Sequence, residues 1–153
     1  MPKSQLLKYI LKEQALYKWP PNWHFYDEDN QVVVFIDTIY KDNALILTID
    51  FTKQYPFLRP NVTCNGKNIR LYYKDLFSSR VKSYEEDCIN LSSVGRCCNT
   101  IMCKNNWSPS FKVVDIVNEF KRIHHCKRRA DERFWARLVS KYVLESVPIY
   151  MYL

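Results

Sequence analysis

Two runs of β-branched and aromatic residues, lying almost end to end, place the strongest constraint on how this chain can fold. The first run is QVVVFIDTIY at 31–40, and the second is ALILTIDF at 44–51. Such residues favour strands, and strands joined by a three-residue connection pair antiparallel. In the second run Leu45, Leu47 and Ile49 share one face of the strand. The pattern therefore predicts an antiparallel β-hairpin.

A helix and shorter strands are predicted around this hairpin. Ser4 is a good N-cap, and the helix should end at Trp19-Pro20-Pro21, because a residue before proline avoids the helical conformation. Side chains at helical spacing predict one mostly apolar face, made of Leu6, Leu7, Ile10, Gln14 and Tyr17. Strands are also expected at about 23–26, with a turn at 27–30, and at 61–64.

The second half of the chain predicts helices after an irregular region. Residues 65–87 are polar and mixed, with a short helix or strand expected at 69–77, and residues 88–106 have the composition of an irregular loop. Ser108 can cap the next helix and Pro109 suits its first position. The apolar face of that helix should contain Val113, Val117, Phe120 and Ile123. A separate last helix is expected from about 130 to 144, with buried Phe134, Trp135, Leu138 and Tyr142.

This order of elements predicts one α+β domain over residues 1–153, with an N-terminal helix, an antiparallel β-meander, an irregular loop and C-terminal helices. The 23 aromatic residues (8 Phe, 4 Trp and 11 Tyr) exclude a mainly disordered chain. With only 2 glycines the chain is not collagen-like. No run of about 18 apolar residues is present, so no membrane span or membrane partner is expected.

Net charge and cysteine content indicate possible partners and a cellular compartment, but they do not identify a function. The 23 basic and 16 acidic residues give a net charge of +7, which suits nucleic acid, an acidic protein or a lipid headgroup as partner. Adjacent Cys97 and Cys98 and a first segment too charged for a signal peptide favour a reducing compartment. The expected location is the cytoplasm or nucleus of a eukaryotic cell, or a virion if the protein is viral.

Three motifs follow one another in a characteristic order. YPFLRPNVTC occupies 55–64 directly after the hairpin, CINLSSVGRCC occupies 88–98, and Trp107-Ser108-Pro109 precedes the next helix. In this order the chain resembles the ubiquitin-conjugating enzyme (UBC) family. That family has a Tyr-Pro-Phe-x-Pro-Pro segment, an active-site loop with spaced Asn, Gly and catalytic Cys, and a Trp-Ser-Pro triplet. The resemblance covers about residues 4–123.

The resemblance implies a UBC-like fold and an acyl-transfer reaction. Ubiquitin or a ubiquitin-like modifier would be accepted as a thioester on Cys98 and passed to a lysine. Asn90 takes the place of the family's loop asparagine, as an oxyanion donor or a brace for the loop, and Gly95 permits the tight turn. A loop cysteine reacts as the thiolate, which Lys104 or Arg96 would favour by local positive charge. The family's acidic residue near the cysteine corresponds to Asp131 or Glu132.

Departures from the family pattern support a second interpretation. Cys88 and Ile89 stand where the family has His and Pro, and the stretch 65–87 contains an insertion. From about residue 124 the helical part is divergent, because the family's proline-rich crossover is missing. These departures favour a non-catalytic UBC-like binding or structural subunit, for example in a viral capsid, and they leave the enzymatic activity open.

Other assignments remain as alternatives. Cys97 or Cys103 would be the reactive thiol if the loop is threaded differently. A structural zinc site would draw on Cys88, Cys97, Cys98, Cys103, His124, His125 and Cys126, although no Cys-x2-Cys pair is present. The basic run 121–129 could contact nucleic acid, although such a run is more often a solvated helix face.

The expected partners follow from these interpretations. An active enzyme would bind the modifier, an activating enzyme and a ligase, whereas a structural member would bind protein subunits of a larger assembly. The main assignment includes no cofactor and no metal.

Overall fold

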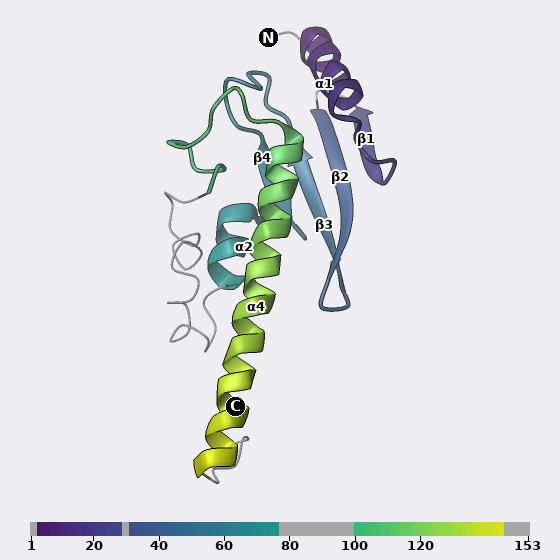
Figure 1. Cartoon of the computed structure of the whole chain (residues 1–153). Coiled ribbons are helices and arrows are strands. Elements are labelled where there is room, and N and C mark those ends of the chain that lie inside the picture. The colour runs from purple at the N-terminus through teal and green to yellow at the C-terminus, as the bar shows by residue number, and fades with distance from the viewer. Residues whose placement is uncertain (1–2, 29–30, 77–99, 146–153) are drawn as a thin grey trace.

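The structure is a computed structural model that describes residues 3–28, 31–76 and 100–145 (Figure 1). It has the predicted α+β order of an N-terminal helix, an antiparallel sheet and C-terminal helical structure. Its elements are α1 (Lys3–Tyr17), β1 (Trp23–Glu28), β2 (Gln31–Tyr40), β3 (Asn43–Asp50), β4 (Asn61–Cys64), β5 (Lys67–Asn68), α2 (Ile69–Leu76) and α4 (Val113–Glu145).

The five strands form one sheet in the order β1-β2-β3-β4-β5, and every neighbouring pair is antiparallel. The predicted hairpin is confirmed: Tyr40 pairs with Asn43, and only Lys41 and Asp42 form the loop. Both loop residues have positive φ angles, of 49° and 63°. Two such residues make a type I′ turn, which matches the right-handed twist of the strands.

One face of the sheet carries the core. In β2 the side chains of Val32, Val34 and Ile36 are buried, while Asp37 and Ile39 are exposed. Alternate residues of a strand point to opposite faces, so β2 presents Val32, Val34 and Ile36 to the core. The opposite face is exposed at Asp37 and Ile39, although Val33 on that face is buried. In Figure 1 α2 and α4 both lie over the same face of the sheet.

Helix α1 uses part of its predicted apolar face. Leu6 and Ile10 are buried in the core, whereas Tyr17 is exposed. Ser4 lies inside the helix, which begins at Lys3, so its predicted capping role is wrong. Residue 18, one position past the last helical residue, adopts a positive φ and closes the end of the helix.

Helix α4 corrects the prediction of two separate helices. It runs without interruption from Val113 to Glu145, 33 residues. No Gly or Pro occurs in that range to end it, and Lys127 and Asp131 form an i, i+4 ion pair at 3.1 Å where the break was expected. Its first half packs on the sheet, and its second half extends beyond it (Figure 1).

The start of α4 also differs from the prediction. Ser108 hydrogen-bonds to Ser110 in a turn before the helix, with its Oγ accepting from the Ser110 N–H at 3.3 Å. The helix begins four residues after Pro109, at Val113. The Asp115 carboxylate accepts a hydrogen bond from the Lys112 N–H at 2.8 Å, which satisfies a backbone donor at the start of the helix.

Residues 69–76 of the stretch that was predicted as a short helix or strand form helix α2. Asn68 accepts a hydrogen bond from the Arg70 N–H at 3.0 Å and so caps α2, and Ile69 and Tyr73 are buried. The rest of the expected insertion, from residue 77, lies outside the described residues. Within the described residues, no helix has a stretch long and apolar enough to cross a bilayer.

Candidate functional site

The residues predicted to carry the chemistry, Cys98 and Asn90, lie outside the described residues. The same holds for the loop residues Cys88, Gly95, Arg96 and Cys97. What the structure does describe is the chain on both sides of this loop. Three described parts of the chain border this region: the segment that follows the loop, the Tyr55–Pro60 segment and the start of α4.

The segment immediately after the loop is tied to α4 by a buried carboxylate. Glu119 accepts hydrogen bonds from the Thr100 hydroxyl and from the Ile101 N–H, the latter at 3.0 Å. The Thr100 hydroxyl in turn accepts from the Met102 N–H at 3.1 Å. Thr100 and Glu119 are both buried. Two residues after Cys98 the chain is thus held against the body of the protein.

Trp107 joins this segment to the Tyr55–Pro60 segment. Its indole N–H donates a hydrogen bond to the Pro56 carbonyl at 2.7 Å, and its ring lies 6.3 Å from the ring of Tyr55, centroid to centroid. Two of the three motifs noted in the sequence are therefore in direct contact, although about 50 residues separate them in the chain.

A second buried carboxylate, Glu13, joins the Tyr55–Pro60 segment to the start of α4. We call the contact region of these two segments with Trp107 the junction. Glu13 of α1 accepts a hydrogen bond from the Tyr55 hydroxyl and another from the Val113 N–H, both at 2.7 Å. Val113 is the first residue of α4, where free N–H groups favour negative charge. Burial raises the pKa of the Glu13 carboxyl, against the two hydrogen bonds, which lower it. Burial also raises the pKa of the Tyr55 hydroxyl, so this group remains a donor.

An open groove of about 260 Å³ lies between residues 52–61 and the segment that contains Lys104 and Trp107. It is lined by Thr52, Phe57, Leu58, Arg59, Asn61, Lys104 and Trp107. Phe57 is 68% exposed and Leu58 is 50% exposed, which is unusual for large apolar side chains placed next to each other. The groove therefore offers apolar contact area beside two cations, a surface suited to an apolar side chain of a protein partner with acidic neighbours.

The two candidate acids, Asp131 and Glu132, differ in their surroundings. The Asp131 carboxylate pairs with Lys41, in the β2–β3 turn, and with Lys127. An acid that helps a lysine to lose its proton must reach that lysine, and the Asp131 side chain is only 16% exposed. Glu132 is exposed on α4. Of the other candidates, Lys104 lines the groove, and the Cys103 side chain is buried.

The candidate metal ligands do not gather in the described part of the chain, where no group of three His, Cys, Asp or Glu side chains could hold a metal ion. His124 instead lies against Tyr72, with 2.6 Å between its Nε2 and the Tyr72 hydroxyl, and its Nδ1 lies 3.0 Å from the Phe120 carbonyl. Burial lowers the pKa of His124, so the neutral ring is favoured. With Nδ1–H donating to the carbonyl, Nε2 accepts from Tyr72.

Cys64, close to Tyr72, is a poor candidate for an alternative nucleophile. It is buried in β4, and burial raises the pKa of its thiol to about 11. A thiol with that pKa is almost entirely protonated at neutral pH and is a poor nucleophile. His125 is exposed and Cys126 is half-buried, and neither joins His124 in a cluster of ligands.

Sequence analysis missed the residues that build the junction. Glu13 and Glu119 were not singled out, although Glu13 lies three positions after Ile10 on the helix face that faces the core. A carboxylate on an apolar face is the signal that could have marked it. Phe57 and Leu58 belong to the YPFLRPNVTC motif, and nothing in that motif predicts that they are exposed.

Comparison of the chain with protein-family models, with curated proteins and with solved structures gives no match. The fold by itself therefore defines the class only coarsely, as an α+β domain with an N-terminal helix, a five-stranded antiparallel sheet and a C-terminal helix.

Proposed function

We propose that this protein is a UBC-like domain that accepts ubiquitin or a ubiquitin-like modifier as a thioester on Cys98 and passes it to a lysine. The observation that supports this most is the hydrogen bond from the Trp107 indole to the Pro56 carbonyl, at 2.7 Å. It joins two of the three motifs on which the resemblance to the family rests. The third motif, residues 88–98, ends two residues before Thr100, which is anchored to Glu119.

The proposed reaction is a pair of acyl transfers. The Cys98 thiolate attacks the carbonyl carbon of a modifier held as a thioester on an activating enzyme, a new C–S bond forms, and the activating enzyme's thiolate leaves. A lysine amine then attacks the new thioester, loses its proton to solvent or a base, and releases the Cys98 thiolate. Asn90 would donate a hydrogen bond to the oxyanion that forms in each step.

The groove supports a protein substrate or partner for this reaction. Phe57 and Leu58 offer an exposed apolar pair, and Arg59 and Lys104 offer positive charge. Such a combination favours a partner with an apolar side chain flanked by carboxylates. Lys104 and Trp107 of the groove lie six and nine residues after the proposed thiol in the sequence, and we propose that a protein delivering or receiving the modifier docks there.

One observation favours the second candidate, a non-catalytic UBC-like binding subunit. Asp131, a proposed acid for the lysine step, is already paired with Lys41 and Lys127. A protein without that acid could still bind the modifier through its surface and act as a subunit of an assembly. The two candidates make different predictions for a covalent adduct.

The test is a thioester assay. The purified chain is incubated with ubiquitin, ubiquitin-activating enzyme and ATP, and a non-reducing gel is compared with a reducing one. We expect an adduct of one ubiquitin that disappears with reductant and in Cys98→Ala, and that forms at least tenfold more slowly in Asn90→Ala. Cys126→Ala is the matched control, because Cys126 is a half-buried thiol outside the proposed site.

The alternative outcomes are distinct. An adduct that persists in Cys98→Ala would mean that the reactive thiol is Cys97 or Cys103. Cys97→Ala and Cys103→Ala would distinguish between these two. No adduct from a chain that circular dichroism shows to be folded would refute the catalytic proposal. Non-covalent binding of ubiquitin, measured by calorimetry on that same preparation, would then support the binding subunit.

A further inference from the structure

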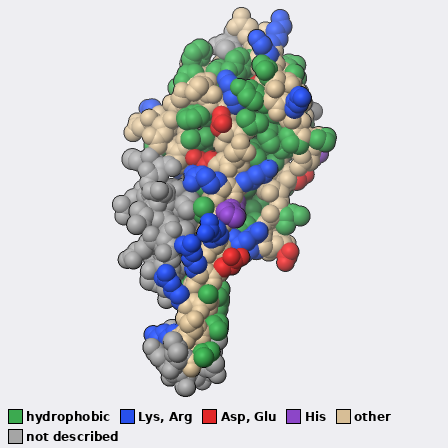
Figure 2. Space-filling view, viewed as in Figure 1, with side chains coloured by type: hydrophobic (Ala, Val, Ile, Leu, Met, Phe, Trp, Pro, Cys, Tyr) green, Lys and Arg blue, Asp and Glu red, His purple; other side chains and the backbone are tan. Residues whose placement is uncertain are grey.

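Helix α4 presents a row of basic side chains to solvent along its first half. The row consists of Lys121, Arg122, His125, Arg128 and Arg129, all of which are exposed. Their spacing of three and four residues places them on one face of the helix. Figure 2 shows Lys and Arg side chains following this part of α4, with a histidine among them.

The row is not neutralised by acidic side chains of the described residues. Among those residues, no carboxylate forms an ion pair with Lys121, Arg122 or Arg129. The acid nearest in sequence on the neighbouring face, Asp131, is already engaged by two lysines. Glu132 ends the row at its C-terminal side. Unpaired cations held on one rigid helix repel one another, so the row favours an anionic partner.

A hollow of about 170 Å³ opens beside the row. It is lined by Thr38, Ile39, Tyr40, Phe120, Lys121, His124, His125 and Arg128. A water molecule occupies about 30 Å³ in the liquid, so the hollow has room for a phosphate group. Its wall carries three basic side chains, Lys121, His125 and Arg128, and the hydroxyls of Thr38 and Tyr40. Such groups often contact phosphate oxygens.

The position of α4 argues against a membrane as the anionic partner. A helix that lies in a membrane surface needs a free apolar face opposite its basic one. Here that face is occupied, because Val113, Ile116, Val117, Phe120 and Ile123 are all buried against the rest of the protein. The basic row can approach a bilayer only as a charged surface without an apolar anchor.

The composition of the row argues against an acidic protein. Stable protein interfaces have a core of aromatic and apolar side chains and are depleted of charge at their centre. The row contains only charged or ionisable side chains, and Ile39 is the exposed apolar side chain at the edge of its hollow. The backbone of a nucleic acid, by contrast, is bound mainly by such charges.

We propose that the basic row of α4 binds the phosphate backbone of nucleic acid. From Lys121 to Arg129 the helix rises about 12 Å, which is the length of three to four base-pair steps of B-form DNA. One phosphate would lie in the hollow between Lys121 and Arg128, and its neighbours would lie along the helix. The contacts are to the backbone alone, so binding is independent of base sequence and strongly dependent on salt.

The test measures fluorescence anisotropy of a labelled 20-base-pair duplex DNA of random sequence, and separately of a single-stranded RNA, at several salt concentrations. For the unmodified chain four cations in contact predict a slope of log K against log salt of about −3 to −4. In Lys121→Gln/Arg122→Gln the slope should become less negative by about 2, and the affinity at 50 mM salt should fall at least about tenfold.

The matched control is Lys8→Gln/Lys12→Gln. Both lysines are exposed on α1, and the double substitution removes the same net charge from another surface. We expect it to change the affinity less than about threefold and to leave the slope unchanged. Circular dichroism and the urea midpoint establish that both double variants are folded.

Three outcomes would overturn the proposal. The first is no binding of either nucleic acid at 50 mM salt by the folded chain. The second is an equal loss of affinity in both double variants, which would mean that net charge alone attracts nucleic acid. The third is binding to vesicles containing phosphatidylserine without binding to duplex or RNA, which would assign the row to a membrane. None of these outcomes depends on a thioester at Cys98.

Discussion

Two buried glutamates show how single residues organise the candidate site. Glu13 binds the Tyr55 hydroxyl and the Val113 N–H, and Glu119 binds Thr100 and the Ile101 N–H. Each carboxylate therefore links a loop to α4 and satisfies a backbone donor that would otherwise be buried without a partner. Burying a carboxylate is unfavourable unless its oxygens accept such bonds.

The substitution Glu13→Gln tests this role. The Tyr55 hydroxyl and the Val113 N–H both donate, and an amide has only one oxygen to accept from them. We expect Glu13→Gln to lower the free energy of unfolding by about 1–3 kcal/mol, measured by urea denaturation at pH 7. Lys12→Gln, exposed on the same helix, should change it by less than about 0.5 kcal/mol. Equal stability of Glu13→Gln and the unmodified chain would mean that Glu13 is protonated.

At the scale of elements, helix ends are set by contacts that hydrophobic periodicity does not reveal. Helix α1 ends at Tyr17, and Lys18 follows with a φ of 49°. The Trp19 N–H then donates to the Gln14 carbonyl at 3.2 Å, the bond of a Schellman motif. Glycine is the usual residue at the position of Lys18, because a side chain is strained at positive φ.

We therefore expect Lys18→Gly to stabilise the protein. Removing the side-chain strain should raise the free energy of unfolding by about 0.5–1 kcal/mol, measured by urea denaturation. The same substitution at Lys12, in the interior of α1, should lower it by about 1 kcal/mol because glycine disfavours helix. A loss of stability in Lys18→Gly would contradict the assignment of the motif.

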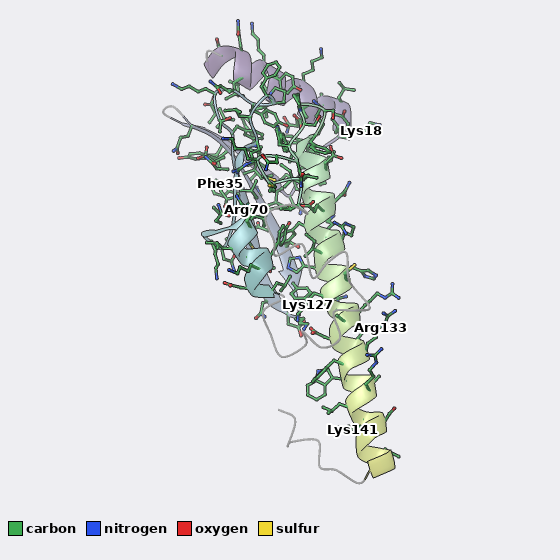
Figure 3. The ribbon with its side chains drawn as sticks, turned by 90° about the vertical axis from the view of Figure 1, so that its left-hand side faces the viewer. Lys18, Phe35, Arg70, Lys127, Arg133 and Lys141 are labelled. Carbon is green, nitrogen blue, oxygen red and sulfur yellow. The ribbon has the colours of Figure 1, made fainter. Side chains whose placement is uncertain are left out.

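At the scale of the whole molecule, α4 belongs to the body only in part. The main hydrophobic core includes α4 residues as far as Ile123. Beyond it, Ala130 and the predicted core residue Leu138 are buried, but Trp135, which was also predicted to be buried, is 44% exposed, and Val139 and Val143 are exposed as well. Figure 3 shows Arg133 and Lys141 on the stretch of helix that extends past the sheet. The contribution of α4 to stability should therefore fall along its length.

The same substitution, valine to alanine, at two positions of α4 tests whether its contribution to stability falls along the helix. Val117 is 3% exposed and Val139 is 46% exposed. Val117→Ala removes buried methyl groups and should lower the free energy of unfolding by about 2 kcal/mol. Val139→Ala should change it by less than about 0.5 kcal/mol, because alanine also favours helix. Similar losses in the two variants, measured by thermal and urea unfolding, would mean that the second half of α4 is packed as tightly as the first.

The candidate site was predictable only where local sequence specifies it. The Tyr55–Pro60 and Trp107 motifs could be recognised in the sequence, but their contact depends on a hydrogen bond across about 50 residues. Asp131 was a reasonable acid from its position after Trp107, but its pairing with Lys41 depends on how the β2–β3 turn meets α4. The roles of Cys98 and Asn90 remain predictions.

The sequence by itself determined the β2–β3 hairpin, its antiparallel pairing and the α+β order, because alternation, β-branching and short connections act between residues close in the chain. It did not predict β5, and it placed a turn at 27–30, although β1 continues to Glu28. Only the tertiary structure decided where α4 begins. Its start depends on Glu13, which lies about 100 residues earlier and supplies an acceptor for the Val113 N–H. Contacts of that kind join residues far apart in sequence, and no local pattern encodes them.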